Sequence, residues 1–452
     1  MRIFFLLAAG GAAMFLLFTA ARAQAPPPIT KVRHAPWAEN AVIYELNVRQ
    51  FTQQGTFRAI MPRVDELKRL GVNMVWFMPI HPIGAKNRKG TLGSYYAVKD
   101  FRAVNPEFGT LDDFKALVAK MHAAGMRVII DFVPNHTAWD NPLAVEHPDW
   151  YAKNAQGNFI PPVPDWADVI QLDYSKQGLR DYMYGVMEYW VRDVGIDGYR
   201  ADVAGRVPTD FWNEARARLE RIKPVFMLAE AEKPELLLKA FDADYASEYF
   251  HLFRRIAKGE AKASDLDGLR ATDAEKYPRG SWRMLFTTNH DQNTWLDTDV
   301  SLFGVEGSKT FALLTYALPG KPLIYNGQEL GNPKKLAFFE RDPIAWKESP
   351  PRAWYERLTH LYTKHASLHA GRMHRVSTKD PIYALTRQAP GDAPFLVVAN
   401  LSGKSVDTTL TLSAPIKTLE EQLGGGHVTP GGHQLTLRLE PWGRRLYRMV
   451  GP

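Results

Sequence analysis

Residues 127–136 read RVIIDFVPNH, a β-branched apolar run that carries Asp131 and ends at His136. Short runs of this kind that alternate with longer helix-periodic stretches are typical of parallel strands joined by helices. The alternation continues from about residue 41 to residue 369 and predicts strands at residues 41–51, 72–80, 127–136, 197–203, 224–231, 243–250, 282–291 and 321–330. Apolar residues recur at helical spacing between them, at residues 59–70, 111–124, 179–194, 209–222 and 305–318. Eight such strands predict an α/β fold, a closed (β/α)8 TIM barrel.

An open doubly wound sheet is the alternative architecture for alternating strands and helices. That fold would place a glycine-rich phosphate-binding turn after an early strand, and the sequence has no such turn. The sixth expected strand, at residues 243–250, has the weakest pattern of the set. The barrel remains the favoured architecture.

A first interruption of the alternation lies at residues 137–175. This segment lacks a helical period and is rich in proline, with Pro142, Pro148, Pro161, Pro162 and Pro164. It predicts a small excursion domain after strand 3, which would leave the barrel at its C-terminal rim, where barrel active sites are built. We therefore expect it to wall one side of a cleft.

A second interruption begins near residue 376. Short alternating runs lie between turns at residues 382–387, 395–399, 408–412, 434–439 and 444–449, and glycines cluster at residues 424–426 and 431–432. This pattern predicts an antiparallel β-sandwich over residues 376–452. The barrel is then expected to comprise residues 37–136 and 176–370.

The N-terminal segment has the features of a secretory signal peptide. Residues 1–23 begin with Arg2, continue through an apolar run at 3–18 and end in Ala21, Arg22 and Ala23, a pattern for cleavage after Ala23. The alternative is a retained anchor, but the run is shorter than the roughly 20 residues that cross a bilayer. We expect a secreted or periplasmic protein with no stable membrane anchor and an extended, proline-rich leader at residues 24–36.

Composition excludes several function classes. The chain has 452 residues, 45% of them hydrophobic, and a formal net charge of +7. Its basic residues are dispersed, whereas a nucleic-acid-binding protein would gather them on one element, so no nucleic-acid partner is expected. The absence of cysteine excludes disulfides and thiolate metal sites.

Polar side chains concentrate at the ends of the expected strands. Asp202, Glu230 and Asp291 end strands four, five and seven, and parallel barrel strands deliver their last residues to one rim. Any one of these residues alone would be read as a turn or capping residue, but carboxylates that converge in a cleft repel one another and are costly to desolvate. A functional site is therefore the better interpretation of the set.

Two positioned carboxyl groups are the minimum for cleaving a glycosidic bond with retention of configuration. Arg200 lies two residues before Asp202, on the same face of a strand, and would keep that aspartate ionised. His136 and His290 can donate hydrogen bonds to sugar hydroxyls. Neither histidine has a zinc-binding spacing such as HExxH, so metal catalysis is not expected.

Over essentially the whole mature chain, the sequence resembles glycoside hydrolase family 13, the α-amylase family. The matching segments are DFVPNH at 131–136, GYRAD at 198–202, LAEA at 228–231 and TTNHD at 287–291, with GSYYAVKDFRAVNPEFGTLDDF at 93–114, QLDY at 171–174, PLIYNGQE at 322–329 and PWGRRLYR at 441–448. The resemblance implies Asp202 as nucleophile, Glu230 as general acid/base and Asp291 as transition-state stabiliser. It implies Tyr96 as the aromatic that stacks on the sugar, with Arg200, His136 and His290 as binding and orienting residues.

Two residues near the expected catalytic carboxylates leave the identity of the acid and the substrate specificity open. Glu232, two residues after Glu230, is the rival acid, although Glu230 follows the apolar run directly, as in the family. Val203 follows the nucleophile, at a position where many α-amylases have a smaller residue. In this respect the sequence resembles enzymes that attack short or α-1,6-linked oligosaccharides.

The resemblance also implies a structural calcium ion. Asn135 and Asp173 match family positions that coordinate calcium, and oxygen ligands of this kind suit that ion. Gln171 stands where another acidic residue is common, which would weaken the site. No organic cofactor is expected. Four tryptophans on rim segments could stack on sugars, but packing within the loops is the favoured interpretation for Trp139, Trp150, Trp166 and Trp295.

The sequence thus predicts a monomeric, secreted, retaining α-glucan hydrolase that cleaves α-1,4 bonds of starch-like chains or maltooligosaccharides. The alternative is an α-1,6 or oligosaccharide α-glucosidase, or a glucan transglycosylase, with the same chemistry. A catalytically inactive binding module is a third hypothesis, which the presence of all three carboxylates and Arg200 disfavours.

Overall fold

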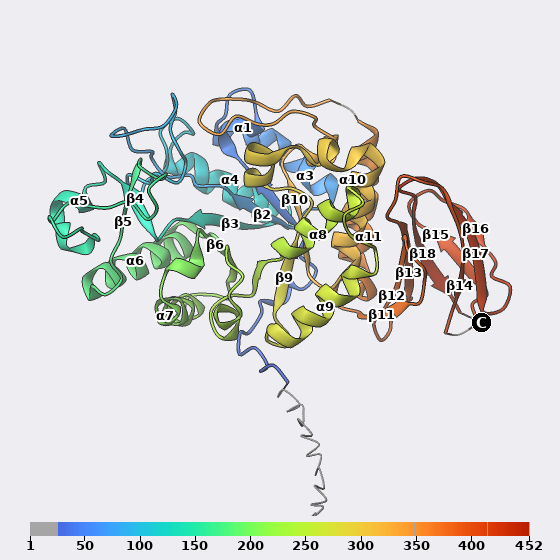
Figure 1. The fold of residues 1–452 in the computed structure, drawn as a ribbon. Helices are drawn as coiled ribbons and strands as arrows, with labels where there is room; N and C mark the ends of the chain where they lie inside the picture. The colour runs from blue at the N-terminus through green and yellow to red at the C-terminus, as the bar shows by residue number, and fades with distance from the viewer. Residues whose placement is uncertain (1–25, 348, 414, 452) are drawn as a thin grey trace, which may run out of the picture.

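A computed structural model describes residues 26–347, 349–413 and 415–451 (Figure 1). The predicted signal peptide at residues 1–23 lies outside these ranges. Within them, no helix combines the length and the apolar character needed to cross a membrane.

A closed parallel barrel forms the body of the molecule, as predicted. Its neighbouring strands, in order around the barrel, are β1 (Ile43–Leu46), β2 (Met74–Phe77), β3 (Arg127–Phe132), β6 (Gly198–Ala201), β7 (Phe226–Ala229), β8 (Ala243–Tyr245), β9 (Trp282–Leu285) and β10 (Lys321–Tyr325), and β10 returns to pair with β1. The strands are short and buried on both faces, which is why their sequences are continuous apolar runs rather than alternating ones.

Helices surround the barrel (Figure 1). They are α1 (Val48–Phe51), α2 (Phe57–Ile60), α3 (Val64–Leu70), α4 (Leu111–Ala123), α6 (Gln177–Tyr189), α7 (Thr209–Glu220), α8 (Ser247–Ala257), α9 (Asp265–Lys276), α10 (Asp299–Ala317), α11 (Pro350–Lys364) and α12 (Ala366–His369). Thr110 begins α4 with a reciprocal cap, in which its hydroxyl accepts from the backbone N–H of Asp113 and the Asp113 carboxylate accepts from the backbone N–H of Thr110.

All eight predicted ranges extend beyond the observed barrel strands, and at residues 41–51 and 243–250 an α-helix begins within the predicted range. The run at residues 41–51 stops as a strand at Leu46 because the side chain of Asn47 accepts from the N–H of Arg49 and starts the short helix α1. The run at residues 243–250 forms strand only over β8, and α8 begins at Ser247. The weak strand pattern at 243–250 therefore covered a strand end and a helix start.

The excursion after β3 contains a small antiparallel pair, β4 (His136–Ala138) with β5 (Val169–Gln171), and the short helix α5 (Leu143–Glu146). The C-terminal part contains a six-stranded antiparallel sheet in the order β11-β12-β13-β18-β15-β16 and a two-stranded sheet of β14 with β17. Their bounds are β11 (Arg372–Val376), β12 (Ile382–Gln388), β13 (Phe395–Asn400), β14 (Val406–Thr411), β15 (Thr418–Glu421), β16 (His427–Val428), β17 (Gln434–Leu439) and β18 (Arg444–Val450). Strand β11 begins at Arg372, before the expected start of the sandwich at residue 376.

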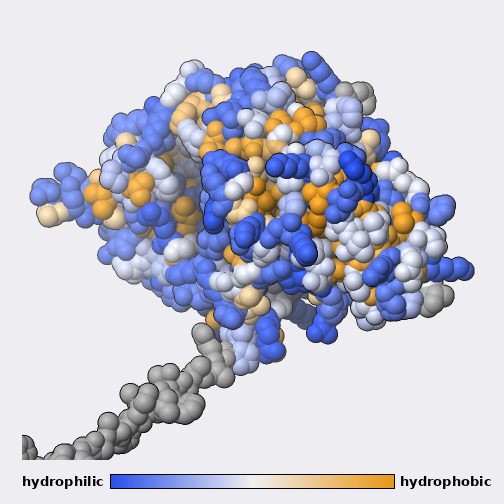
Figure 2. All heavy atoms as spheres, turned by 45° about the vertical axis from the view of Figure 1, so that its right-hand side comes forward, coloured by the Kyte–Doolittle hydropathy of each residue, from blue (hydrophilic) through white to orange (hydrophobic). Residues whose placement is uncertain are grey.

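The described part of the leader, residues 26–36, crosses the end of the barrel at which β8 and β9 begin. Its Lys31 N–H donates to the Leu238 carbonyl at 2.8 Å, and His34 Nδ1 lies 2.7 Å from Asp242 Oδ1. The His34 ring also stacks on Trp282. Figure 2 shows a face of the molecule that is largely hydrophilic, with apolar side chains exposed in groups between polar ones.

Candidate active site

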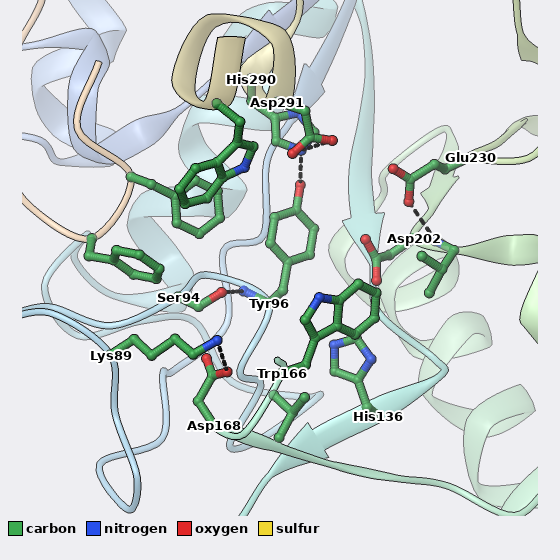
Figure 3. A pocket seen from close by; sticks show the side chains of 15 residues that line it. Lys89, Ser94, Tyr96, His136, Trp166, Asp168, Asp202, Glu230, His290 and Asp291 are labelled. Atoms are coloured by element: carbon green, nitrogen blue, oxygen red, sulfur yellow. Dashed lines mark hydrogen bonds and ion pairs between the residues drawn. The ribbon is translucent and has the colours of Figure 1, made fainter. Parts of the chain in front are cut away.

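A cavity of about 300 Å3 opens at the C-terminal ends of the barrel strands (Figure 3). Six of the seven residues predicted for catalysis and sugar binding line it, namely Tyr96, His136, Asp202, Glu230, His290 and Asp291. The seventh, Arg200, is fully buried beneath them. The parallel strands thus bring together residues that are far apart in the sequence.

Arg200 joins the carboxylates of three strands. Its Nη1 donates to Asp131 Oδ1 at 2.9 Å and to Asp202 Oδ1 at 3.0 Å, and its Nη2 lies 3.0 Å from Glu230 Oε1. Two carboxylates held on one guanidinium are necessarily close neighbours. Retaining glycosidases need this proximity, since their two carboxyl groups stand only about 5 Å apart.

Burial strongly affects the acids of this cluster. It raises the pKa of Asp202 well above its ordinary value, the neighbouring Glu230 raises it further, and Arg200 opposes both effects. Burial also raises the pKa of Asp131 to about 6 against the opposing charge of Arg200. The guanidinium therefore favours the charged form of both carboxylates, but it does not fully offset burial, so the sequence-based expectation that Arg200 keeps Asp202 fully ionised is not met in the free site.

His290 is held by groups from three segments. Its Nδ1 lies 2.5 Å from Glu45 Oε1 in β1, and its Nε2 lies 2.8 Å from Tyr96 Oη and 3.5 Å from Asp291 Oδ2. Burial lowers the pKa of His290, but Asp291 and Glu45 outweigh burial and raise it to about 9. The imidazole is thus charged at neutral pH.

Glu45 is a site residue that the sequence interpretation missed. It is fully buried within the apolar run IYEL of β1, and burial raises its pKa although His290 opposes the rise. A charged residue inside an otherwise apolar barrel strand was the available signal, because burying such a group requires a partner.

His136 differs from His290 in its charge. Burial lowers the pKa of His136 to about 3, so the ring is neutral. Its ring centroid lies 5.5 Å from that of Trp166 in an edge-to-face contact. His136 can therefore offer one donor and one acceptor to a ligand in the cavity.

Glu230 and Glu232 occupy different environments. Glu230 Oε2 accepts from the backbone N–H of Val203 at 2.7 Å, and its other oxygen contacts Arg200. Glu232 lines a neighbouring cavity of about 340 Å3, where burial raises its pKa. The geometry therefore favours Glu230 over Glu232 as the proton-transferring acid.

Aromatic and charged residues outside the predicted set complete the cavity. Phe338, Phe339 and Trp295 form an aromatic wall, in which the Phe338 ring lies 5.3 Å from that of Trp295 and 5.0 Å from that of Phe339, and the paired Lys89 and Asp168 also line the cavity. Trp295 is 60% exposed, so packing within its loop is the wrong interpretation for this tryptophan. Trp166 lines the cavity while it also packs against the core, and Trp139 and Trp150 pack against the core.

The candidate calcium residues share another cavity, which Arg180 and Arg206 also line. The Asp173 carboxylate accepts from the Ser175 N–H at 3.0 Å, and the Asn135 side chain contacts His136. Calcium prefers six to eight oxygen ligands with several carboxylates. One engaged carboxylate beside two arginines fits that preference poorly, and a calcium ion at this place stays an untested prediction.

Comparison with known proteins identifies one family. The family model described as "Alpha amylase, catalytic domain" matches residues 38–166 and 146–352. "Alpha-amylase MalA" of Haloarcula japonica is 28% identical over 327 residues, which are 69% of this chain and 46% of that protein. The chain therefore spans about half the length of this relative.

Two solved structures align with nearly the whole chain. The "noncanonic maltogenic alpha-amylase AmyB from Thermotoga neapolitana" has a TM-score of 0.85 and 30% identity, covering 92% of this chain and 99% of its own. An "alpha-amylase from Lactobacillus plantarum" has a TM-score of 0.83 and 31% identity, covering 92% of this chain and 100% of its own.

Proposed function

Since the chain belongs to the α-amylase family, we propose that it is a retaining glycoside hydrolase that cleaves α-1,4-glucosidic bonds of starch-like chains or maltooligosaccharides. The observation that carries this proposal is the Arg200 guanidinium in contact with both Asp202 and Glu230. It holds a nucleophile and a proton donor at one reacting centre, as the two-step mechanism requires.

The first step forms a covalent intermediate. An oxygen of the Asp202 carboxylate bonds to the anomeric carbon as the glycosidic C–O bond breaks. Glu230, carrying a proton, transfers it to the departing oxygen. The attack requires the charged form of Asp202, which the neighbouring Arg200 guanidinium favours.

In the second step, Glu230 takes a proton from water. The resulting hydroxide oxygen bonds to the anomeric carbon, the bond to Asp202 breaks, and both carboxyl groups return to their starting states. Asp291 faces the cavity with a 38% exposed side chain and would stabilise the positive charge that develops on the sugar. Tyr96 lies in the cavity together with Asp202 and Asp291 (Figure 3), and its ring is nearly parallel to that of Phe338, with centroids 6.2 Å apart. A sugar can stack on this aromatic ring.

An oligosaccharide α-glucosidase or transglycosylase is the second candidate. Val203 favours it, because this residue lines the cavity directly after Asp202, at the position where the sequence resembles enzymes that attack short or α-1,6-linked oligosaccharides. Such a glucosidase would cleave panose preferentially, whereas a transglycosylase would form products longer than the substrate.

The test is hydrolysis of maltoheptaose followed by proton NMR. We expect the α-anomer to appear first, and Asp202→Asn or Glu230→Gln to lower kcat by at least about 1,000-fold. Asp299→Asn is the matched control, because Asp299 is a buried aspartate that does not line the cavity. Initial release of the β-anomer, or full activity of Asp202→Asn, would contradict the mechanism.

We also propose that the protein is exported, cleaved after Ala23 and monomeric. The N-terminal segment supports export, because its charged start, apolar run and small-residue end are those of a signal peptide. N-terminal sequencing of the extracytoplasmic protein should begin at Gln24, and light scattering should give the monomer mass. Retention of residues 1–23 would contradict cleavage.

A further inference from the structure

Residues 85–93 form an arch between two other segments of the rim. On one side the arch contacts the excursion domain: Lys89 Nζ lies 3.2 Å from Asp168 Oδ1 and donates to the Asp165 carbonyl at 2.5 Å, and the Ala85 N–H donates to Asp140 Oδ2 at 3.0 Å. These contacts fix the arch to a part of the chain that is remote in sequence.

On its other side the arch contacts the segment that carries Phe339. The Leu92 N–H donates to the Phe339 carbonyl at 3.0 Å, and the Thr91 N–H donates to Glu340 Oε1 at 2.8 Å. Gly90 approaches so closely that a Cβ there would lie 2.3 Å from Phe339 Cβ. The arch therefore spans from the excursion domain to the aromatic wall.

The arch lies at the end of the cavity away from the proton donor. Figure 3 shows Glu230 on one side of Tyr96 and the Lys89–Asp168 pair on the other. Glu230 and Asp291 also line the neighbouring cavity, which continues past the proton donor. Because the leaving group must adjoin Glu230, the substrate's leaving part extends into that second cavity and its non-reducing part extends toward the arch.

We propose that the arch, tied down by the Lys89–Asp168 ion pair, closes the non-reducing side of the cleft, so that the enzyme releases short saccharides from chain ends instead of cutting inside long chains. This inference rests on the proposed function. It assigns Lys89 and Asp168 as specificity-determining residues of the same site.

The dimensions and lining of the cavity support a short non-reducing side. A volume of about 300 Å3 is at the lower end of ordinary ligand sites. The Phe338 ring lies nearly parallel to that of Tyr96, with centroids 6.2 Å apart, and Trp295 lies 5.3 Å from Phe338. This aromatic wall offers a stacking surface just beyond the reacting sugar, and the arch bounds the space beyond it.

The test compares maltoheptaose with maltoheptaose whose non-reducing end carries a 4,6-O-benzylidene group. The full-length mature enzyme should hydrolyse the blocked substrate at least about 100-fold more slowly than the free one. Lys89→Ala and Asp168→Ala should each raise kcat/KM on the blocked substrate by at least about 10-fold and give longer early products from free maltoheptaose.

Lys86→Ala is the matched control, because Lys86 lies in the same arch but does not line the cavity, and its ammonium group faces the Trp139 ring. The ratio of its kcat/KM values on free and blocked maltoheptaose should equal that of the wild type. Equal rates of hydrolysis of the free and the blocked substrate by the wild type would overturn the inference. So would an unchanged preference for the free substrate in Lys89→Ala and Asp168→Ala, provided that both variants fold. Failure of the wild type to hydrolyse even free maltoheptaose would instead refute the proposed function.

Discussion

Arg200 supplies a buried positive charge at the centre of the carboxylate cluster. It is fully buried and contacts Asp131, Asp202 and Glu230 from three strands. A lysine at this position would keep the charge but could not direct separate nitrogens at several carboxylates, because it has a single ammonium group.

We expect Arg200→Lys to lower kcat by at least about 100-fold, because Asp202 and Glu230 would lose their common anchor. Arg216→Lys is the matched control: Arg216 is also buried and contacts Asp242 and Glu220, but it does not line the cavity. Both variants should unfold at lower temperature, and only Arg200→Lys should lose kcat on maltoheptaose. Equal kcat losses would contradict a specific role of Arg200.

A second prediction concerns the charge of His290. Its pKa of about 9 lies above the ordinary value of about 6.5, so the protonated form stabilises the folded state. This stabilisation is complete below about pH 6.5 and is lost as the pH rises through about 9. The charged groups that face His290 are Glu45, Asp291, Arg200 and Asp131, and Tyr96 also contacts it.

Glu45→Gln removes one of the two carboxylates that hold the proton on His290. The imidazole should then titrate at lower pH than in the wild type, as measured by NMR with the signal assigned through a His290→Asn variant. Glu329→Gln is the control, because Glu329 is equally buried but accepts from Tyr44 Oη. An unchanged His290 titration in Glu45→Gln would contradict the proposed role of this pair.

At the scale of elements, close contact between strands fixes particular residues. Gly198 begins β6 with φ of +147°, and a Cβ there would lie 1.9 Å from the carbonyl oxygen of Phe226 in the next strand. No side chain fits at that position unless β6 and β7 move apart.

Gly198→Ala should therefore lower the free energy of unfolding by about 3 kcal/mol or more, measured by urea denaturation. Gly268→Ala, in the exposed helix α9 with open space around it, should be neutral or should raise that energy by up to about 1 kcal/mol. If the two variants unfolded alike, the close approach of β6 and β7 would not be a constraint on the fold.

The strand ends of the barrel could be predicted from the sequence, because apolar runs such as RVIIDF end where polar residues gather. This placed Asp202, Glu230 and Asp291 correctly at one rim. Glu45 stands out as a charge within the apolar run IYEL, but its partner His290 comes from a distant segment, so its role could not be predicted. The Lys89–Asp168 pair escaped prediction because no local pattern marks it. The short strands β11, β15 and β16 also escaped, because few of their residues face the core.

At the scale of the whole molecule, internal contacts hold together segments that are distant in sequence. The leader contacts the start of β8 and β9, and the excursion domain is tied to the arch. Among the described residues, no group of three or more His, Cys, Asp or Glu side chains is arranged to hold a metal ion.

We accordingly expect removal of divalent ions with a chelator, or addition of calcium, to leave Tm unchanged in calorimetry. Arg180 and Arg206 beside Asp173 are the physical reason, because they disfavour a cation in that cavity. A fall in Tm of several degrees on chelation, reversed by calcium, would establish the structural ion that the family resemblance implies.

Trapping the covalent intermediate would show directly whether Asp202 is the nucleophile. The enzyme would be incubated with 5-fluoro-α-D-glucosyl fluoride, digested and analysed by mass spectrometry. We expect one glucosyl-type adduct on the peptide that contains Asp202, and none in Asp202→Asn. An adduct on another residue, or turnover of maltoheptaose with inversion and no adduct, would contradict that role of Asp202.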